Sequence, residues 1–420
     1  MPTGHLRIAG GLCAVALALG AGACGSGGSS SSTTSSAAAG KPASGGKPLT
    51  VGISLSLSGD FSDPGNAALR GYKLWADSVN AKGGILGRKV VLKVVDDTSS
   101  PNQVVTNYQT LINRDHVDLT FGPFSTLLTA PAAAVANRYG YAFPEPAGGG
   151  PAVFKEKLGN VFFVQPAPVV NCGDPFVAWL QTLPAGQRPK TAAYPTLDDP
   201  FAAPIVDRAR KSLEAAGVKT VFKTVYPPET ADFTPIVQKY ANAKPDLVFA
   251  GTQSDDAYAQ VKAMVQQKFS PKYLFLSNGA NSPTEFPTKV GKANTDGIFS
   301  CGDWFADLKS SGNPQFVAAY LSKYGGRPDQ IDPGSAEAYA VGQLVQEVAA
   351  KTKKLDNKTI ISSLHQGTWP VIEGNLSWNP DGSPKGSALM VEWIGSQLLP
   401  VYPQATALHA PTTPKPAWGG

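Results

Sequence analysis

The chain has 420 residues, with 36 Lys and Arg against 31 Asp and Glu, which gives a formal net charge of +5. This excess is spread thinly, without a Lys/Arg cluster or a basic stripe interleaved with aromatic residues. Nucleic-acid binding is therefore not indicated, because it needs a concentration of positive charge. A chain of this length is longer than a domain with a single hydrophobic core usually is, so we expect two lobes.

The N-terminus has the features of an export signal. Residues 1–23 carry one Arg and then the apolar run IAGGLCAVALALGAGA, which is too short and too weakly flanked for a membrane span. The run ends in AGACG, which resembles a bacterial lipobox with Cys24 as the lipidated first residue, although Ala21 stands where Leu is usual. Ordinary cleavage nearby, with Cys24 free, is the alternative.

A tether is expected to follow Cys24. Residues 24–48 are rich in Gly, Ser and Ala and have no apolar periodicity, so we expect a flexible linker between a lipid anchor and a folded body. No later run of about 18 apolar residues occurs, so the lipid is the only membrane attachment that the sequence predicts.

From Leu49 onward, apolar strands alternate with helices of amphipathic spacing, and the rhythm restarts after residue 168. The first run predicts strands at 49–57, 89–97, 117–124, 141–147 and 161–168, with helices between them. The second run predicts strands at 191–199, 219–227, 246–252 and 272–278, with helices at 202–216 and 257–268. Alternation of this kind predicts two α/β lobes with parallel sheets covered on both faces.

The C-terminal third is less regular. We expect a strand at 296–305, then helices near 314–324, 335–351 and 357–365, then β-structure at 371–382 and 388–403 with a turn at Asn-Pro-Asp-Gly. The Pro- and Thr-rich tail, residues 404–420, is expected to be loose.

The loop after the third strand has the composition of an anion site. Gly122 and Pro123 end the strand, and Ser125 and Thr126 stand where the next helix begins. The first turn of a helix offers unpaired N–H groups and a positive dipole end, which suit a small anion. The alternative is that one of the two hydroxyls is simply the helix N-cap.

Two cysteines remain in the body. With Cys13 in the signal and Cys24 as the anchor, Cys172 and Cys301 are expected to form a disulfide, since oxidising compartments favour pairing. Two separate buried thiols are the alternative.

An ordered series of segments resembles one known family. Residues 80–112 and 117–126 are similar to the N-terminal lobe of branched-chain amino-acid-type (type I) periplasmic solute-binding proteins of ABC importers. The similarity continues through nearly all of the mature body, at 198–204, 233–252, 337–349 and 377–382. The resemblance implies two Rossmann-like lobes joined by three crossover strands, with the ligand in the cleft between them.

The resemblance also implies how the chain divides between the lobes. The crossovers would lie near 165–168, near 277–279 and within 374–386. The N-terminal lobe would then comprise 49–166 and 278–375, and the C-terminal lobe 167–277 and 376–403.

Several residues are implied to face the ligand. Ser125 and Thr126 would take a ligand carboxylate, helped by Gly148 and Gly149, where the family usually adds a hydroxyl residue. Phe201 stands where the family often places Tyr, so its ring would stack without donating a hydrogen bond. Thr252 and Asp255, or Asp256 in the neighbouring register, occupy the loop where amino-acid binders hold the α-ammonium.

Two further positions are weighed against plainer roles. Phe61 is expected at the cleft mouth and Trp304 on the hinge-side wall, whereas core packing is the alternative for Trp304. Packing into its own helix is the alternative for Phe201, and helix capping is the alternative for Asp255 and Asp256.

The sequence lacks the common catalytic motifs: no G-x-S-x-G, H-E-x-x-H or phosphate loop occurs, and the histidines have no metal spacing. We therefore predict no enzyme, cofactor or metal, and no nucleic-acid partner. The expected function is that of a monomeric, lipid-anchored extracytoplasmic protein that delivers an amino acid or organic carboxylate to an ABC permease. A ligand-sensing partner in signalling is the alternative.

Overall fold

The N-terminal lobe is built on parallel strands. The computed structural model describes residues 46–419, so the expected signal peptide, Cys24 and most of the tether lie outside the described residues. Strand β1 (Leu49–Leu55) pairs in parallel with both β2 (Val90–Asp96) and β3 (Leu119–Phe121). Except for half-buried Thr50, every residue of β1 is buried, as expected for a parallel strand covered on both faces.

A second parallel pair continues this lobe. Strand β4 (Phe143–Glu145) pairs with β5 (Val161–Phe163), and the Gly122 N–H after β3 donates to the Pro144 carbonyl of β4 (3.0 Å). Carboxyl ends of successive strands therefore meet at one edge, where open α/β sheets bind ligands.

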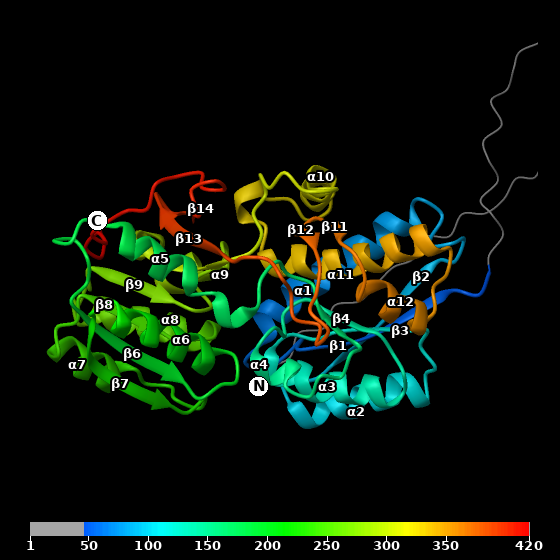
Figure 1. The fold of residues 1–420 in the computed structure, drawn as a ribbon, viewed down its shortest axis with the longest axis horizontal. Helices are drawn as coiled ribbons and strands as arrows, with labels where there is room; N and C mark the ends of the chain where they lie inside the picture. The colour runs from blue at the N-terminus through cyan, green and yellow to red at the C-terminus, as the bar shows by residue number, and fades with distance from the viewer. Residues whose placement is uncertain (1–45, 420) are drawn as a thin grey trace, which may run out of the picture. The chain divides into compact units, whose positions relative to one another are not determined.

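Helices cover both faces of these strands. One face packs on α1 (Ser62–Asn80), α11 (Pro333–Thr352) and α12 (Asn357–Leu364), and the other on α2 (Pro101–Asn113), α3 (Thr126–Arg138) and the short α4 (Pro151–Phe154). Segments from the C-terminal third complete the lobe: α10 (Asn313–Tyr324), β11 (Trp369–Val371) and β12 (Gly374–Leu376). In Figure 1 these orange and yellow segments lie with the blue helix α1.

The C-terminal lobe carries a seven-stranded sheet in the order β14-β13-β10-β9-β8-β6-β7. Its parallel strands are β6 (Thr191–Leu197), β7 (Lys219–Tyr226), β8 (Leu247–Ala250), β9 (Tyr273–Leu276) and β10 (Ile298–Gly302). Strands β13 (Leu389–Ile394) and β14 (Gln397–Tyr402) are added in antiparallel pairing.

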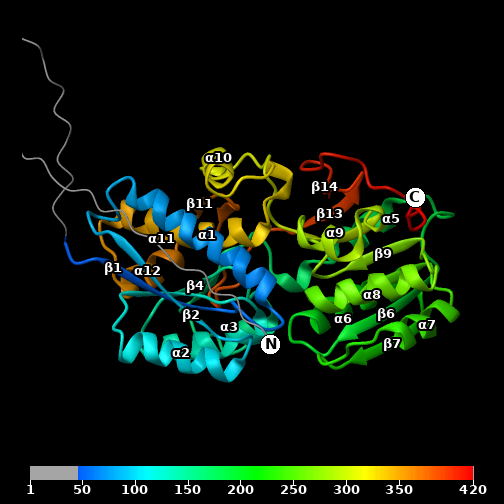
Figure 2. The ribbon, with the colours of Figure 1, turned by 180° about the vertical axis from the view of Figure 1, so that it is seen from behind.

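Helices again cover both faces. One core lies under α5 (Asp174–Thr182) and α6 (Ala202–Ala215), and the other under α7 (Thr234–Asn242), α8 (Ser254–Gln266) and α9 (Glu285–Val290). Helix α5 lies in front of the sheet in Figure 1, whereas α8 and α9 lie in front of it in Figure 2, which is seen from behind.

The expected second crossover near 277–279 is wrong. Strand β10 pairs with β9 on one side (Phe299 with Phe275) and with β13 on the other (Cys301 with Met390), so residues 278–302 belong to the C-terminal lobe. The chain changes lobe only after Gly302. Gly279, at φ +83°, makes a turn inside the lobe, and its Cβ position would meet the Gln253 carbonyl.

The expected boundary at residue 376 is also wrong. Leu376 and Trp378 are buried in the core of the N-terminal lobe, and the Trp378 indole N–H donates to the Phe163 carbonyl (2.6 Å). The third crossover lies between Gly386 and the start of β13 at Leu389, just beyond the expected range 374–386. A Cβ at Gly386 would collide with the Pro166 carbonyl, so the first and third crossovers touch.

The tail is not loose over residues 404–419. The Thr412 N–H donates to the buried Glu392 carboxylate (2.9 Å), the Lys415 N–H to the Lys272 carbonyl (3.0 Å), and the Trp418 indole to the Phe269 carbonyl (2.6 Å). Residues 404–419 therefore belong to the C-terminal lobe. Within the described residues, no helix has the length and apolarity needed to span a membrane.

Gly71 lies at the contact between α1 and α11 in the N-terminal lobe. Its Cβ position coincides with the backbone carbonyl of Ser335 on α11, and the Ser335 hydroxyl donates to the Ala67 carbonyl on α1 (2.7 Å). We expect Gly71→Ala to lower the free energy of unfolding by about 1–3 kcal/mol, because two helix backbones must separate. Urea unfolding measures this, with the open position Gly186→Ala as the control. Equal effects of the two changes would contradict the close approach of α1 and α11.

Candidate functional site

One cavity of about 700 Å³, including space open to solvent, lies between the two lobes and takes its lining from both. Three aromatic rings line it, those of Phe124, Phe163 and Phe201. The polar side chains that line it are Ser125, Gln165, Gln253, Ser277, Asn278, Asn281, Asp303 and Glu337. No Lys, Arg or His belongs to this lining.

Ser125 is placed for an anion. It is the N-cap position of α3, it is 2 % exposed, and its hydroxyl has no hydrogen-bond partner among the described residues. The first turn of α3 contains no acidic side chain, and no side chain caps it. The alternative that Ser125 is only a helix cap is therefore not supported, because its hydroxyl does not bond the helix end.

Other backbone donors near the cavity are already occupied. The Ala147 and Gly148 N–H groups donate to the Glu145 carboxylate (2.9 and 2.5 Å). The N–H groups of Phe201 and Ala202, at the start of α6, donate to Asp199 (2.7 and 3.0 Å). The start of α3 thus remains an open helix end at the cavity.

Thr126 and the glycines play a packing role. The Thr126 hydroxyl accepts from the Gly150 N–H (3.1 Å), and Thr126 does not line the cavity. A Cβ at Gly148 would collide with Thr129, and one at Gly149 with the Phe163 ring. The expectation that Thr126, Gly148 and Gly149 contact the ligand is therefore not supported, because these residues hold the loop against α3.

Phe201 lines the cavity from the C-terminal lobe. It is half-buried at the N-cap position of α6, and part of its ring packs against both cores of that lobe. Phe201 therefore both packs within its own lobe and lines the cavity, and its stacking on a ligand stays a prediction.

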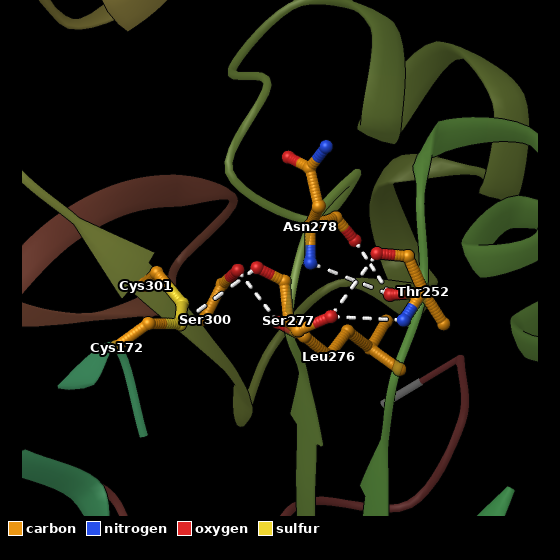
Figure 3. Close-up of a disulfide and its surroundings, with 7 residues drawn as sticks. All are labelled: Cys172, Thr252, Leu276, Ser277, Asn278, Ser300 and Cys301. Atoms are coloured by element: carbon orange, nitrogen blue, oxygen red, sulfur yellow. Dashed lines mark hydrogen bonds between the residues drawn. A yellow bond between two sulfur atoms is a disulfide. The ribbon is translucent and has the colours of Figure 1, made fainter. Parts of the chain in front are cut away.

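Thr252 does not face the cavity. Its hydroxyl donates to the Asn278 carbonyl (2.8 Å), and its N–H donates to the Ser277 hydroxyl (2.8 Å), as Figure 3 shows. These bonds tie the ends of β8 and β9 together, and Thr252 is fully buried. Its expected contact with the ligand is therefore not supported: the residue supports Ser277 and Asn278, which do line the cavity.

Asp255 and Asp256 are neighbours in the sequence, but their carboxylates have different surroundings. The Asp256 carboxylate accepts from the Gln253 N–H (2.8 Å) and from the Tyr226 hydroxyl, so it caps α8. Asp255 is exposed and lines a second hollow together with Phe61, at the mouth between the lobes. Neither carboxylate nor Phe61 lines the cavity that contains Ser125, so their expected contact with the ligand is not supported.

Trp304 is a core residue. It is 4 % exposed, its indole N–H donates to the Asn313 side chain (2.8 Å), and its ring packs edge-on against Phe316. The expected wall role is wrong, because the residue beside it, Asp303, faces the cavity instead.

Sequence reasoning missed the two acids of the cavity. Asp303 follows β10 at the second crossover, and Glu337 lies on α11. A signal existed for Glu337: it stands in the apolar stretch SAEAYAVGQLV, where a carboxylate without a nearby Lys or Arg has no ordinary surface role. Asp303 carried no such signal, because its position depends on where the chain leaves β10.

The disulfide lies at the wall of the cavity. Cys172 and Cys301 are bonded, with Cα atoms 5.3 Å apart, and both line the cavity. Cys172 follows the first crossover, and Cys301 precedes the second, beside Ser300 and Ser277 (Figure 3). The bond therefore joins two of the three connections between the lobes. Among the described residues, no cluster of His, Cys, Asp and Glu has the arrangement of a metal site.

Two α/β lobes with one cavity at the carboxyl edges of their sheets define a solute-binding protein. The chain belongs to the periplasmic binding protein family, whose model matches residues 48–397. It is 23 % identical over 369 residues to "Leu/Ile/Val-binding protein homolog 8" of Brucella abortus, covering 85 % of this chain and 91 % of that protein.

Solved structures share the fold. The substrate-binding protein LivJ of Streptococcus pneumoniae, in complex with isoleucine, has a TM-score of 0.74 and 18 % identity, covering 88 % of this chain and 100 % of that one. A solute-binding protein from R. palustris in complex with benzoate has a TM-score of 0.72 and 21 % identity, covering 89 % and 99 %. These are binding proteins of the same type I fold, with ligands of two different kinds.

Glu145 gives a pH-dependent prediction. Its carboxyl is fully buried, and burial raises its pKa to about 8 from the ordinary 4.5. A raised folded-state pKa means that its stabilising contribution is complete below pH 4.5 and is lost as the pH rises through 8. The natural protein should lose this stability as the pH rises from 5 to 8, whereas Glu145→Gln, which cannot ionise, should not. We therefore expect the free energy of unfolding of Glu145→Gln, relative to that of the natural protein, to increase by at least about 1 kcal/mol from pH 5 to pH 8. Thermal unfolding at both pH values measures this, and a constant difference would contradict it.

Proposed function

We propose that this protein captures a small carboxylate, either an amino acid or an organic acid with an aromatic or aliphatic body, and delivers it to an ABC importer. Capture occurs by closure of the two lobes over the ligand, without a covalent step. Cys24 anchors the protein to the outer face of the cell membrane, and residues 24–48 tether it there.

The unpartnered hydroxyl of Ser125 at the open end of α3 carries this proposal. A carboxylate can accept from that hydroxyl, which is otherwise buried without a partner among the described residues, and from the first N–H groups of α3, which no side chain caps. The helix dipole supplies the positive potential that the cavity lacks, since no Lys, Arg or His lines it.

The three phenylalanine rings support an apolar body for the ligand. Phe124 and Phe163 approach from the N-terminal lobe and Phe201 from the C-terminal lobe, so a ring or a branched chain between them loses its contact with water on both sides. The structural neighbours fit this range, because LivJ is in complex with isoleucine and a solute-binding protein from Rhodopseudomonas palustris is in complex with 3,4-dihydroxybenzoic acid.

A thermal-shift screen tests the proposal directly. The panel contains branched-chain and aromatic amino acids, benzoate, hydroxybenzoates and short aliphatic acids, with the matching amides as controls that lack the carboxylate. Binding to the folded state alone raises the melting temperature. We expect at least one carboxylate to raise it and its amide not to do so, and a panel without any stabilising carboxylate would contradict the proposal.

Ser125→Ala tests the anion contact. We expect the dissociation constant of the best ligand from the screen to rise by the equivalent of about 1–3 kcal/mol, because a hydrogen bond to a charged group is lost. Thr129→Val is the matched control, since the Thr129 hydroxyl is also buried on α3 without a partner but does not line the cavity. Calorimetric titration of both variants measures the difference. Equal affinities would remove Ser125 from the site.

A further inference from the structure

Two carboxyl groups of the cavity lack a positive partner. Glu337 on α11 is 7 % exposed, and no donor hydrogen-bonds its carboxylate among the described residues; Asp303 accepts only from the N–H of the next residue, Trp304 (2.6 Å). The two side chains lie within hydrogen-bonding reach of each other. Since ionised carboxylates only accept, a contact between them requires a proton.

A third acid lies behind this pair. Glu373, between β11 and β12, is 3 % exposed, and neither of its carboxyl oxygens has a hydrogen-bond partner. It raises the pKa of Glu337, as do Asp303 and Asp332. Arg70 on α1 opposes the rise in the pKa of Asp332, and among the described residues no positive group lines the cavity beside the pair.

Two other acids of the same lobe, Asp332 and Asp97, are satisfied. Asp332 accepts from the Ser282 hydroxyl (2.8 Å) and the Gly334 N–H (3.0 Å). Asp97 accepts from Ser54 (3.1 Å), Ser56 (2.6 Å) and the Ser99 N–H (3.0 Å). The fold therefore supplies donors to these two carboxylates, whereas Glu337 and Glu373 receive none from the described residues and Asp303 receives only the neighbouring Trp304 N–H.

A buried carboxylate without a partner is unfavourable, so its charge must be removed by a proton or balanced by a cation. Burial is the main reason why the pKa of Glu337 is raised well above its ordinary value and that of Asp303 to about 6. In the protein without ligand, the pair therefore holds a proton near neutral pH. A cation entering the cavity takes the place of that proton.

We propose that Asp303 and Glu337 bind a positively charged nitrogen of the ligand, and that capture of the ligand expels the proton that the pair holds into solvent. This inference rests on the proposed function and narrows it. The ligand is a zwitterion with its carboxylate at Ser125 and its cationic nitrogen at the acid pair, rather than a plain aromatic or aliphatic acid. Asp303 enters from the second crossover, so the contact lies at the hinge and not on the loop after β8.

Matched ligand pairs test this with the full-length protein. The probes are L-phenylalanine against 3-phenylpropanoate, L-leucine against 4-methylpentanoate, and 5-aminopentanoate against pentanoate, each titrated calorimetrically at pH 7. We expect the amine of at least one pair to bind at least tenfold more tightly than its deaminated partner. We also expect its binding enthalpy to depend on the ionisation enthalpy of the buffer, with the sign of proton release.

Substitutions of Asp303 and Glu337 test whether these two acids cause the preference for the amine and the proton release. We expect Glu337→Gln and Asp303→Asn to lose most of the preference for the amine and the proton release, while the deaminated acid still binds. Asp255→Asn, a carboxylate at the mouth outside the cavity, is the control and keeps both.

The outcomes separate the two proposals. Equal binding of both members of every pair, or a preference that survives in both acid variants, overturns the role of the acid pair and leaves carboxylate capture standing. Tighter binding of the amine without proton release overturns the exchange step. A panel in which no carboxylate of either kind binds overturns the proposed function, and the inference with it.

Discussion

The pairing of β10 on both of its edges determines which side chains meet in the cavity. Because β10 has β9 on one side and β13 on the other, the chain stays in the C-terminal lobe until Gly302 and crosses only then. Asp303 is therefore the first residue of the crossover, and Cys301 is held next to Cys172, where the first crossover arrives. The same strand thus positions the disulfide, an acid of the cavity and the hinge. If β10 belonged to the other lobe, none of the three would lie at the cavity wall.

Electrostatics then restricts what the cavity accepts. Its positive potential comes from the open end of α3, equivalent to about half an elementary charge, and its negative charge comes from Asp303 and Glu337. At an effective dielectric constant of about 20, two like charges 4 Å apart repel each other by about 4 kcal/mol. A purely anionic guest near an ionised pair would face a penalty of that order, whereas a proton or a cationic nitrogen at the pair removes it. The polarity of the cavity is thus set by α3 and α11 of the N-terminal lobe together with Asp303 at the second crossover.

Much of the fold was predictable because local pattern and tertiary structure agree. Residues 90–96 and 101–113 have the strand and helix that periodicity and the Pro101 start signal predict, and the family resemblance supplied the two lobes. The lobe boundaries were not predictable, since Ser277 to Gly279 has the composition of a chain exit but makes a turn within one lobe. Whether a strand ends a lobe or continues it depends on its neighbours in the sheet, which short-range pattern does not contain.

The candidate site was less predictable than the fold, for a physical reason. The spacing of Ser125 and Thr126 places both at the start of α3, but it does not indicate which hydroxyl turns to the cavity and which accepts from the Gly150 N–H. Likewise, Thr252 and Asp256 have side chains suited to a ligand. Both, however, already form hydrogen bonds within the protein, at the end of β8 and at the start of α8. A polar side chain serves a ligand only if the fold leaves it without a partner, and that is a property of contacts distant in sequence.

The glycine loop that follows β4 is fixed by contacts within the N-terminal lobe. Glu145 takes the N–H groups of Ala147 and Gly148, and the following glycines let the loop lie against Thr129 and the Phe163 ring. A hydroxyl side chain at Gly149 would occupy the space of that ring, so the aromatic wall and the second hydroxyl exclude each other. The cavity therefore exchanges one polar contact for an apolar surface. The polar groups that line the cavity still include Ser125 at the end of α3 and the two acids, Asp303 and Glu337.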